Sequence, residues 1–262
     1  MRVGLALSGG GTRGIAHLGA LKAFEEWGIT IHEISGTSAG SIAAAFYTHG
    51  YSPEEALDVI TKTNLFKVVW PAFSWSGLLS TSKGEAIINQ YLDADSFGQA
   101  DRPLKIVAAN LNSGKAEVFT SCSLVKALMA SSCIPFMFQP VKINGDQFID
   151  GGIVNNLPAE CLHESCDIVI GVNVVPVIPQ EDFGGVKKMV ERVSMIALSA
   201  NVEASSKLCD LLITPRELRK YGTLDIKFAK DIFEIGYEYT HHVLEMDKDT
   251  ELVQSIISAE KA

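Results

Sequence analysis

The chain has 262 residues, of which 47% are apolar and 20% charged, and its formal net charge is −9. This composition supports a sizeable buried core and excludes a disordered or fibrous protein. Because acidic residues outnumber basic ones and no run of lysine or arginine occurs, the composition also excludes a nucleic-acid-binding role.

The cysteines and the apolar runs indicate in which cellular compartment the protein is expected. The five cysteines are odd in number and form no Cys-x-x-Cys pair, so neither a disulfide framework nor a zinc site is indicated. We expect reduced thiols in a soluble, cytoplasmic protein. Residues 3–7 are too short an apolar run for a secretory leader, and residues 168–179 are too short and broken to span a bilayer. Contact with a membrane surface would then be transient.

Short apolar runs alternate with helical patterns along most of the chain, which predicts a largely parallel sheet covered on both faces. Serine followed three residues later by glutamate marks helix starts at Ser52 and Ser82. No linker or repeat occurs, so one domain over residues 1–262 is expected. Strands are predicted at 3–7, 31–35, 105–109, 116–120, 148–150, 168–175 and 211–214, and helices at 15–27, 41–47, from 52, 82–91, 123–131, 185–207 and 228–244.

A glycine loop follows the first predicted strand and matches the pattern G-x-G-x-x-G. Its backbone amides, beside a helix start, suit negative charge. Three uses of such a loop are considered. Dinucleotide binding would need an acid at the end of the second strand, whereas Glu33 lies inside it, and a phosphate-binding P-loop would need Gly-Lys-Ser/Thr, which is missing. The third use is an oxyanion hole. A plain tight turn is the fourth interpretation. The loop consists of Gly9, Gly10, Gly11, Thr12, Arg13 and Gly14.

A second motif, G-x-S-x-G, lies where the next strand meets a helix, which is the context of a nucleophile elbow. Its glycines permit a sharp turn that holds Ser38 outward, and the helix start favours negative charge nearby. A structural turn serine is the alternative. The elbow consists of Gly36, Thr37, Ser38, Ala39 and Gly40.

A serine nucleophile needs a group that accepts its proton. None of the six histidines sits in an obvious catalytic turn, and the elbow comes earlier than in an ordinary α/β-hydrolase. Asp150 ends a short strand and is followed by Gly151 and Gly152, whose freedom to adopt positive φ would allow a sharp turn. By itself Asp-Gly-Gly is equally consistent with a simple turn.

Taken together and in this order, the motifs resemble the patatin-like phospholipase family over residues 1–175. The matching segments are 7–19, the elbow 36–40, the stretch 130–135 with the pattern A-S-x-x-I-P, and 150–158. The resemblance implies a three-layer α/β/α sandwich, a dyad of Ser38 and Asp150, and an oxyanion hole at Gly10 and Gly11 with Arg13 adjacent. It implies hydrolysis of lipid esters without a metal or organic cofactor.

Two other functions stay open: a Ser-His-Asp esterase of the ordinary α/β-hydrolase type, and a nucleotide-binding module using the loop Gly9 to Gly14. The tryptophan-rich segment 65–79 is either a lid, an acyl-chain groove or irregular core. Met129, Phe136, Met137 and Phe138 either line an acyl pocket or pack beneath the sheet. The headgroup, the acyl chain and the oligomeric state are not indicated.

Overall fold

The computed structural model describes residues 1–63, 65, 81–92, 96–135, 138–176, 185–222 and 225–259. Within them an eight-stranded sheet has the order β5-β6-β3-β2-β1-β7-β8, and β4 pairs with β3. Its strands are β1 (Val3–Leu7), β2 (Glu33–Thr37), β3 (Leu104–Asn110), β4 (Lys115–Phe119), β5 (Val141–Ile143), β6 (Asp146–Asp150), β7 (Ile168–Val172) and β8 (Leu211–Ile213). From β3 to β8 all neighbours are parallel, as predicted.

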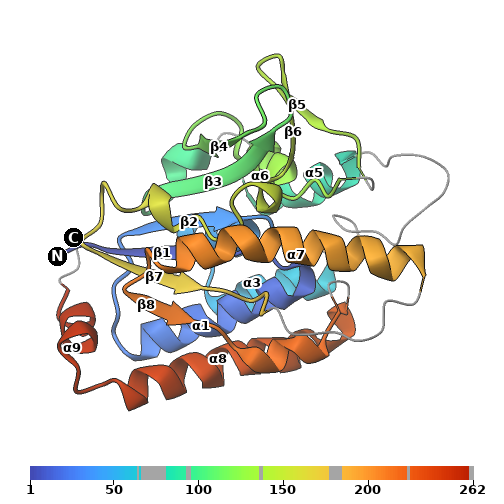
Figure 1. Cartoon of the computed structure of the whole chain (residues 1–262). Helices are drawn as coiled ribbons and strands as arrows, with labels where there is room; N and C mark the ends of the chain where they lie inside the picture. Colours follow the sequence, from blue (N-terminus) through green and yellow to red (C-terminus); the bar gives the residue numbers. More distant parts are fainter. Residues whose placement is uncertain are drawn as a thin grey trace.

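Helices lie on both sides of this sheet (Figure 1). The α-helices are α1 (Ile15–Glu26), α2 (Ala39–Thr48), α3 (Pro53–Lys62), α5 (Ser82–Ile88), α6 (Leu124–Ser131), α7 (Val186–Ser206), α8 (Ala229–Met246) and α9 (Glu251–Ile257). Short 3-10 helices are η1 (Gly11–Gly14), η2 (Ser96–Gln99), η3 (Gly151–Ile153), η4 (Ala159–Cys161), η5 (Arg216–Lys220) and η6 (Ile226–Phe228). The predicted three-layer α/β/α arrangement is confirmed.

Alternation along the strands separates the two faces of the sheet. On one face, Leu5 and Leu7 of β1 join the large core that α1, α2 and α8 close. On the other face, Ala6 packs in a smaller cluster with Val169 of β7 and Val202 of α7. Helix α7 therefore covers the face opposite to α1 and α8.

Helices α1 and α8 lie side by side (Figure 1) and touch at backbone distance. A Cβ at Gly19 would lie 2.0 Å from the Phe233 carbonyl oxygen, and one at Gly236 would lie 2.1 Å from that of Ala16. Only glycine leaves room for two helices at this separation, which explains glycine in the interior of two helices.

The second strand was placed two residues too early. Strand β2 begins at Glu33 and runs through Gly36 and Thr37, because these residues pair with both β1 and β3. Helix α2 then begins at Ala39 rather than at residue 41. The turn between strand and helix is thus Ser38 alone, much tighter than the sequence indicated.

The two predicted capping boxes have different outcomes. At Ser52 the prediction is confirmed, since its Oγ accepts from the Glu55 amide at 3.2 Å and its amide donates to Glu55 Oε2 at 2.9 Å. At Ser82 it is wrong. Thr81 takes the N-cap position and its Oγ1 donates to Glu85 Oε1 at 2.7 Å, and α5 ends at Ile88.

The side of the sheet beyond β2 departs from the parallel pattern. Strands β4, β5 and β6 are antiparallel to their neighbours, and β6 carries Asp150. Strands β5 and β6 form a hairpin through Asn144 and Gly145, with φ of 50° and 95°. Asn-Gly is the favoured two-residue turn between antiparallel strands, and this signal was overlooked in the sequence.

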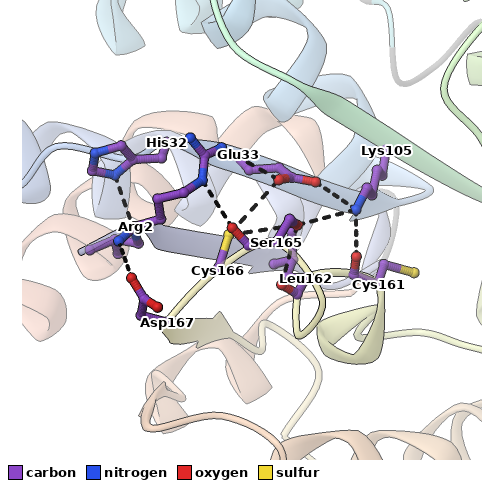
Figure 2. A network of polar contacts seen from close by, with 10 residues as sticks. Arg2, His32, Glu33, Lys105, Cys161, Leu162, Ser165, Cys166 and Asp167 are labelled. Atoms are coloured by element: carbon purple, nitrogen blue, oxygen red, sulfur yellow. Dashed lines mark hydrogen bonds and ion pairs between the residues drawn. The ribbon is translucent and has the colours of Figure 1, made fainter. Parts of the chain in front are cut away.

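The amino ends of the parallel strands hold a polar network (Figure 2). Glu33 is buried, and its carboxylate lies 2.6 Å from Lys105 Nζ and 3.8 Å from Arg2 Nη2. Lys105 also donates to the Cys161 carbonyl at 2.6 Å, while the Arg2 amide donates to Asp167 at 2.7 Å. Glu33 therefore ties together the start of three neighbouring strands.

Several sequence predictions concern apolar and reactive segments. Within the segment 65–79 only Leu65 is described, so the lid prediction lies outside the described residues, as do Phe136 and Met137. Met129 and Phe138 are buried in the large core. No disulfide joins any of the five cysteines. Among the described helices, none has both the length and the apolar composition needed to cross a bilayer.

Candidate active site

Ser38 occupies a strained turn at the carboxyl end of β2. Its φ of 52° and ψ of −121° are unusual for a residue with a side chain. The turn is possible because its neighbours are glycines: a Cβ at Gly40 would lie 2.3 Å from the Leu7 carbonyl oxygen, and one at Gly36 would lie 2.7 Å from the Ser41 nitrogen. Close packing of β1, β2 and α2 therefore places Ser38 at the tip of a sharp turn between strand and helix, the geometry typical of a nucleophile elbow.

Distant residues hold the elbow in place. The Ser38 amide donates to Ser131 Oγ at 2.8 Å, and that hydroxyl donates to the Val107 carbonyl at 2.6 Å. Thr37 Oγ1 donates to the Asn155 carbonyl at 2.8 Å. Ser131 belongs to the A-S-x-x-I-P stretch, so the sequence drew attention to this segment but gave no role to its serine.

Asp150 lies directly beside Ser38. Ser38 Oγ donates to Asp150 Oδ2 at 2.7 Å, and both side chains are buried. The other carboxylate oxygen accepts the Gly152 amide at 2.8 Å, and the Asp150 amide donates to the Cys133 carbonyl at 2.8 Å. The carboxylate is thus fixed on both sides, with one oxygen facing the serine.

The two glycines after Asp150 serve a different purpose from the one predicted. Neither has positive φ. A Cβ at Gly151 would lie 2.2 Å from the Val107 carbonyl oxygen, and one at Gly152 would lie 2.6 Å from Leu198 Cδ2 and 2.7 Å from Asn156 Oδ1. Glycine is required here for close approach to β3 and α7, not for backbone handedness.

The surroundings of Asp150 make it a stronger base than an ordinary carboxylate. Burial raises the pKa of Asp150 from 3.8 to about 6, while the hydrogen bonds from Gly152 and Ser38 act in the opposite direction. No described lysine or arginine forms an ion pair with this carboxylate. A carboxylate with a pKa near 6 is well matched to accept a proton at neutral pH.

The glycine loop lies against the nucleophile. A Cβ at Gly9 would be 3.2 Å from Ser38 Cβ, so the loop and the elbow are in contact. The Gly9 amide donates to the Asn156 carbonyl at 3.1 Å and is not available to a substrate. Among the described residues, no acceptor is assigned to the amides of Gly10 and Gly11, and Gly11 has a φ of 61°. These two loop amides are therefore available to bind a negatively charged group.

The rest of the loop anchors it. Thr12 Oγ1 donates to the Gly222 carbonyl and accepts from the Asp225 amide, each at 3.1 Å. Arg13 Nε donates to the Tyr221 carbonyl at 2.8 Å. A Cβ at Gly14 would lie 2.4 Å from Ala39 Cβ, so Gly14 permits contact between η1 and α2. The loop is therefore held from both sides, by α2 and by residues 221–225.

No histidine hydrogen-bonds to Ser38 or Asp150, and all six histidines lie in the described part of the chain. His17 follows the glycine loop by three residues, and its Nε2 lies 2.7 Å from the Ser8 carbonyl oxygen. Burial lowers the pKa of His17 to about 4, so this side chain is neutral at pH 7. Its ring contacts the backbone at the start of the glycine loop.

Residues 5–163 match the family model described as patatin-like phospholipase. The chain belongs to the patatin-like phospholipase family. It is 26% identical over 280 residues to lysophospholipase NTE1 of Kluyveromyces lactis, covering 93% of this chain and 19% of that protein. It is 31% identical over 176 residues to an uncharacterized NTE family protein of Mycobacterium tuberculosis, covering 66% of this chain and 49% of that protein.

The chain thus spans about a fifth of the length of the yeast relative and about half that of the mycobacterial one. Among solved structures, VipD from Legionella pneumophila has a TM-score of 0.53 at 16% identity, covering 94% of this chain and 67% of that chain. This likeness extends the shared fold over nearly all of the chain, beyond the residues that the family model matches.

Proposed function

We propose that this chain hydrolyses carboxylic esters of lipids, as a phospholipase A or a lysophospholipase, with Ser38 as nucleophile and Asp150 as its base. The observation that carries the proposal is the 2.7 Å hydrogen bond from Ser38 Oγ to Asp150 Oδ2 in a buried site. Family membership and the lysophospholipase name of the yeast relative support a lipid ester as substrate.

The first half of the cycle acylates Ser38. Its Oγ attacks the ester carbonyl carbon while Asp150 Oδ2 takes the hydroxyl proton. The carbonyl oxygen becomes an oxyanion that the Gly10 and Gly11 amides stabilise, at the positive end of the adjoining helices. When the bond to the alkoxy oxygen breaks, Asp150 returns its proton to that oxygen, and the alcohol or lysophospholipid leaves.

The second half releases the acyl group. Water attacks the acyl carbon and gives its proton to Asp150. The bond between that carbon and Ser38 Oγ breaks, Asp150 reprotonates the serine, and a free carboxylic acid leaves. The pKa of about 6 suits both directions of this proton transfer, because the carboxylate is ionised at pH 7 yet basic enough to accept a proton.

The two alternative functions have weaker support. A Ser-His-Asp esterase requires a histidine beside the serine, whereas the serine hydroxyl is already bonded to a carboxylate. A dinucleotide site requires an acid at the carboxyl end of β2, whereas Glu33 is the first residue of that strand and is paired with Lys105. Both observations favour the dyad.

The decisive experiment labels the purified protein with a fluorophosphonate and assays it on a chromogenic short-chain ester and on phospholipids and lysophospholipids. We expect covalent modification at Ser38, and a loss of about 10⁴-fold or more in kcat/KM for Ser38→Ala with the fold retained. Ser206→Ala removes an exposed serine hydroxyl on α7 and is the matched control. Undiminished hydrolysis by Ser38→Ala would exclude the proposal.

We further propose that residues 1–262 form one domain acting in the cytoplasm, since the thiols are unbridged. A single calorimetric unfolding transition and recovery of activity in the cytosolic fraction would support this. Two separate transitions, or recovery outside the cytosol, would contradict it.

A further inference from the structure

Asn201 of α7 holds the turn that follows Asp150. Its Nδ2 donates to the Gly152 carbonyl at 2.8 Å, and its Oδ1 accepts the Asn156 amide at 2.9 Å. A backbone carbonyl requires a donor and a backbone amide requires an acceptor, so the carboxamide fits these two partners in one orientation only. One side chain therefore joins both ends of the turn between Gly152 and Asn156.

Gly152 connects Asn201 to the carboxylate of Asp150. The Gly152 amide donates to Asp150 Oδ1 at 2.8 Å, while the Gly152 carbonyl accepts Asn201. The peptide groups on both sides of this glycine are thus held, one by the carboxylate and one by the asparagine. The other carboxylate oxygen accepts the Ser38 hydroxyl at 2.7 Å. Because both oxygens belong to one planar group, a shift of Gly152 also turns the oxygen that faces Ser38.

Asn201 is connected to the glycine loop through Asn156. The Asn156 amide donates to Asn201, and the Asn156 carbonyl accepts the Gly9 amide at 3.1 Å. A Cβ at Gly9 would lie 2.5 Å from Asn156 Oδ1, so the buried Asn156 side chain also packs against the loop. A displacement of Asn156 would therefore move the start of the loop that carries Gly10 and Gly11.

Helix α7 is itself fixed at this point. Val202, the next residue, is buried in the smaller core cluster with Ala6 and Val169. Leu198, which lies three residues before Asn201 and therefore on the same face of the helix, contacts Gly152 so closely that a Cβ there would be 2.6 Å from Leu198 Cδ2. Asn201 thus projects from a helix that is packed on the sheet, as a residue that fixes a site requires.

The matched family motifs do not include Asn201. The family-model match ends at residue 163, and α7 lies beyond it in the sequence. Helix α7 reaches the site because it covers the face of the sheet opposite to α1 and α8 (Figure 1). The contact with the turn after Asp150 is therefore visible in the fold but carries no local signal in the sequence.

We propose that Asn201 is a positioning residue, which holds Asp150 and the glycine loop in place beside Ser38 through Gly152 and Asn156. Its two partners are backbone groups, so it acts through them rather than on the substrate. Without this side chain, the turn and the loop are no longer fixed to each other, and the carboxylate loses its single orientation. The role rests on the proposed function, because its main consequence is slower ester hydrolysis.

Loss of Asn201 also has a consequence for pH dependence. Burial raises the pKa of Asp150 to about 6, and the hydrogen bond from Gly152 is the first of the two effects that lower it. A less firmly held Gly152 amide therefore raises this pKa further. Among the described residues, the Cys133 thiol also interacts with the carboxylate, but burial raises the pKa of this thiol to about 12, so it stays neutral in the same range.

The test uses two variants of the full chain. Asn201→Ala removes both hydrogen bonds. Asn201→Asp keeps the size of the side chain and an acceptor for the Asn156 amide, but it loses the donor to Gly152. Ser199→Ala is the matched control, because it truncates a polar side chain of the same helix whose hydroxyl donates to the Ile196 carbonyl at 2.8 Å.

Three quantities are measured for each protein. Steady-state kinetics on a soluble chromogenic ester, from pH 5 to pH 8, give kcat and KM. Carbon-13 NMR of labelled aspartate follows the titration of the Asp150 carboxyl, which is assigned with Asp150→Asn and does not depend on catalysis. Thermal unfolding reports whether the fold is intact.

We expect both Asn201 variants to lower kcat at pH 7 by about tenfold or more while KM stays within about twofold, because the loss is one of geometry rather than of substrate binding. The acid limb of kcat/KM and the NMR titration of Asp150 should both move to higher pH, by about half a unit or more. Ser199→Ala should leave all of these quantities unchanged. If Asn201→Ala is unfolded at the assay temperature, the isosteric Asn201→Asp decides the question.

Kinetics like those of the parent protein, with an unshifted titration of Asp150, would overturn the proposal. So would a fall in kcat that accompanies a lower unfolding temperature but leaves the pH profile and the titration of Asp150 in place, because Asn201 would then serve stability alone. If the parent protein cleaves no ester but Asn201→Ala still shifts the titration of Asp150, the proposed function fails while the positioning role stands.

Discussion

Two buried carboxylates lie at opposite ends of the same parallel strands, and they differ in whether a cation lies beside them. Glu33, at the amino end of β2, has Lys105 Nζ at 2.6 Å and Arg2 Nη2 at 3.8 Å (Figure 2). Asp150, beside the carboxyl end of β2, has hydrogen bonds from Ser38 and Gly152 but no cation among the described residues.

Under the proposed function, the difference follows from what each carboxylate does. A buried carboxylate that only joins strands is best neutralised, because an unpaired charge in a core destabilises the fold. A carboxylate that must accept a proton is weakened as a base by a nearby cation. The described structure gives Asp150 no ion pair. The unpaired buried charge lowers the stability of the fold, and the same burial raises the pKa of this carboxyl.

The largest effect is expected at Asp150. Asp150→Asn keeps the shape but cannot take the serine proton, so kcat/KM for a chromogenic ester should fall by about 10³-fold or more. The same variant should be more stable at pH 7, by on the order of 2 kcal/mol, because a buried unpaired charge is removed. Steady-state kinetics and urea denaturation check both. Retained activity, or a large loss of stability, would contradict the interpretation of Asp150 as a buried, unpaired base.

Glu33→Gln should show the reverse pattern. It leaves Lys105 without its carboxylate, and we expect a loss of about 1–3 kcal/mol in the free energy of unfolding, since Lys105 is partly exposed to water. Activity on a soluble ester should stay within about twofold, because the two carboxylates are at opposite ends of the sheet. Lys62→Gln, which breaks an exposed pair with Asp58, is the control and should leave the free energy of unfolding nearly unchanged.

The pH dependence tests the basicity of Asp150 directly. With a pKa of about 6, the ionised fraction falls about tenfold between pH 7 and pH 5, so kcat/KM should fall by the same factor and level off above pH 7. The linked effect on stability has the opposite sign. The folded pKa lies above the unfolded value of 3.8, so the contribution of Asp150 to stability is full below about pH 4 and is lost as the pH rises through 6.

Matched pH titrations of the parent protein and of Asp150→Asn separate this group from the others. The variant should lack the part of the stability change between pH 4 and pH 6 that is due to Asp150. An activity profile that is flat from pH 5 to pH 8 would mean that Asp150 is not the titrating base.

Local motifs predicted the segments that meet at Ser38, and long-range pairing explains what they missed. The elbow and the glycine loop could be predicted because glycine spacing and apolar runs are local signals. The length of β2 could not be predicted in this way. Gly36 belongs to the strand because it pairs with both β1 and β3, and Thr37 because it pairs with β3. The antiparallel pairing of the strand that carries Asp150 with β3 was missed in the same way, and so was the hydrogen bond from the Ser38 amide to Ser131 Oγ.

The separation of the dyad has a consequence during synthesis. Ser38 and Asp150 are 112 residues apart, and the elbow itself is tied to residues 131 and 155. A nascent chain released or stalled before β6 contains Ser38 and Ser131 but neither Asp150 nor Asn155, whose carbonyl accepts the hydrogen bond from Thr37. Contacts this distant in sequence form late in folding. Under the proposed function, ester cleavage therefore requires that β6 has joined the sheet, and a chain that ends before Asp150 lacks it.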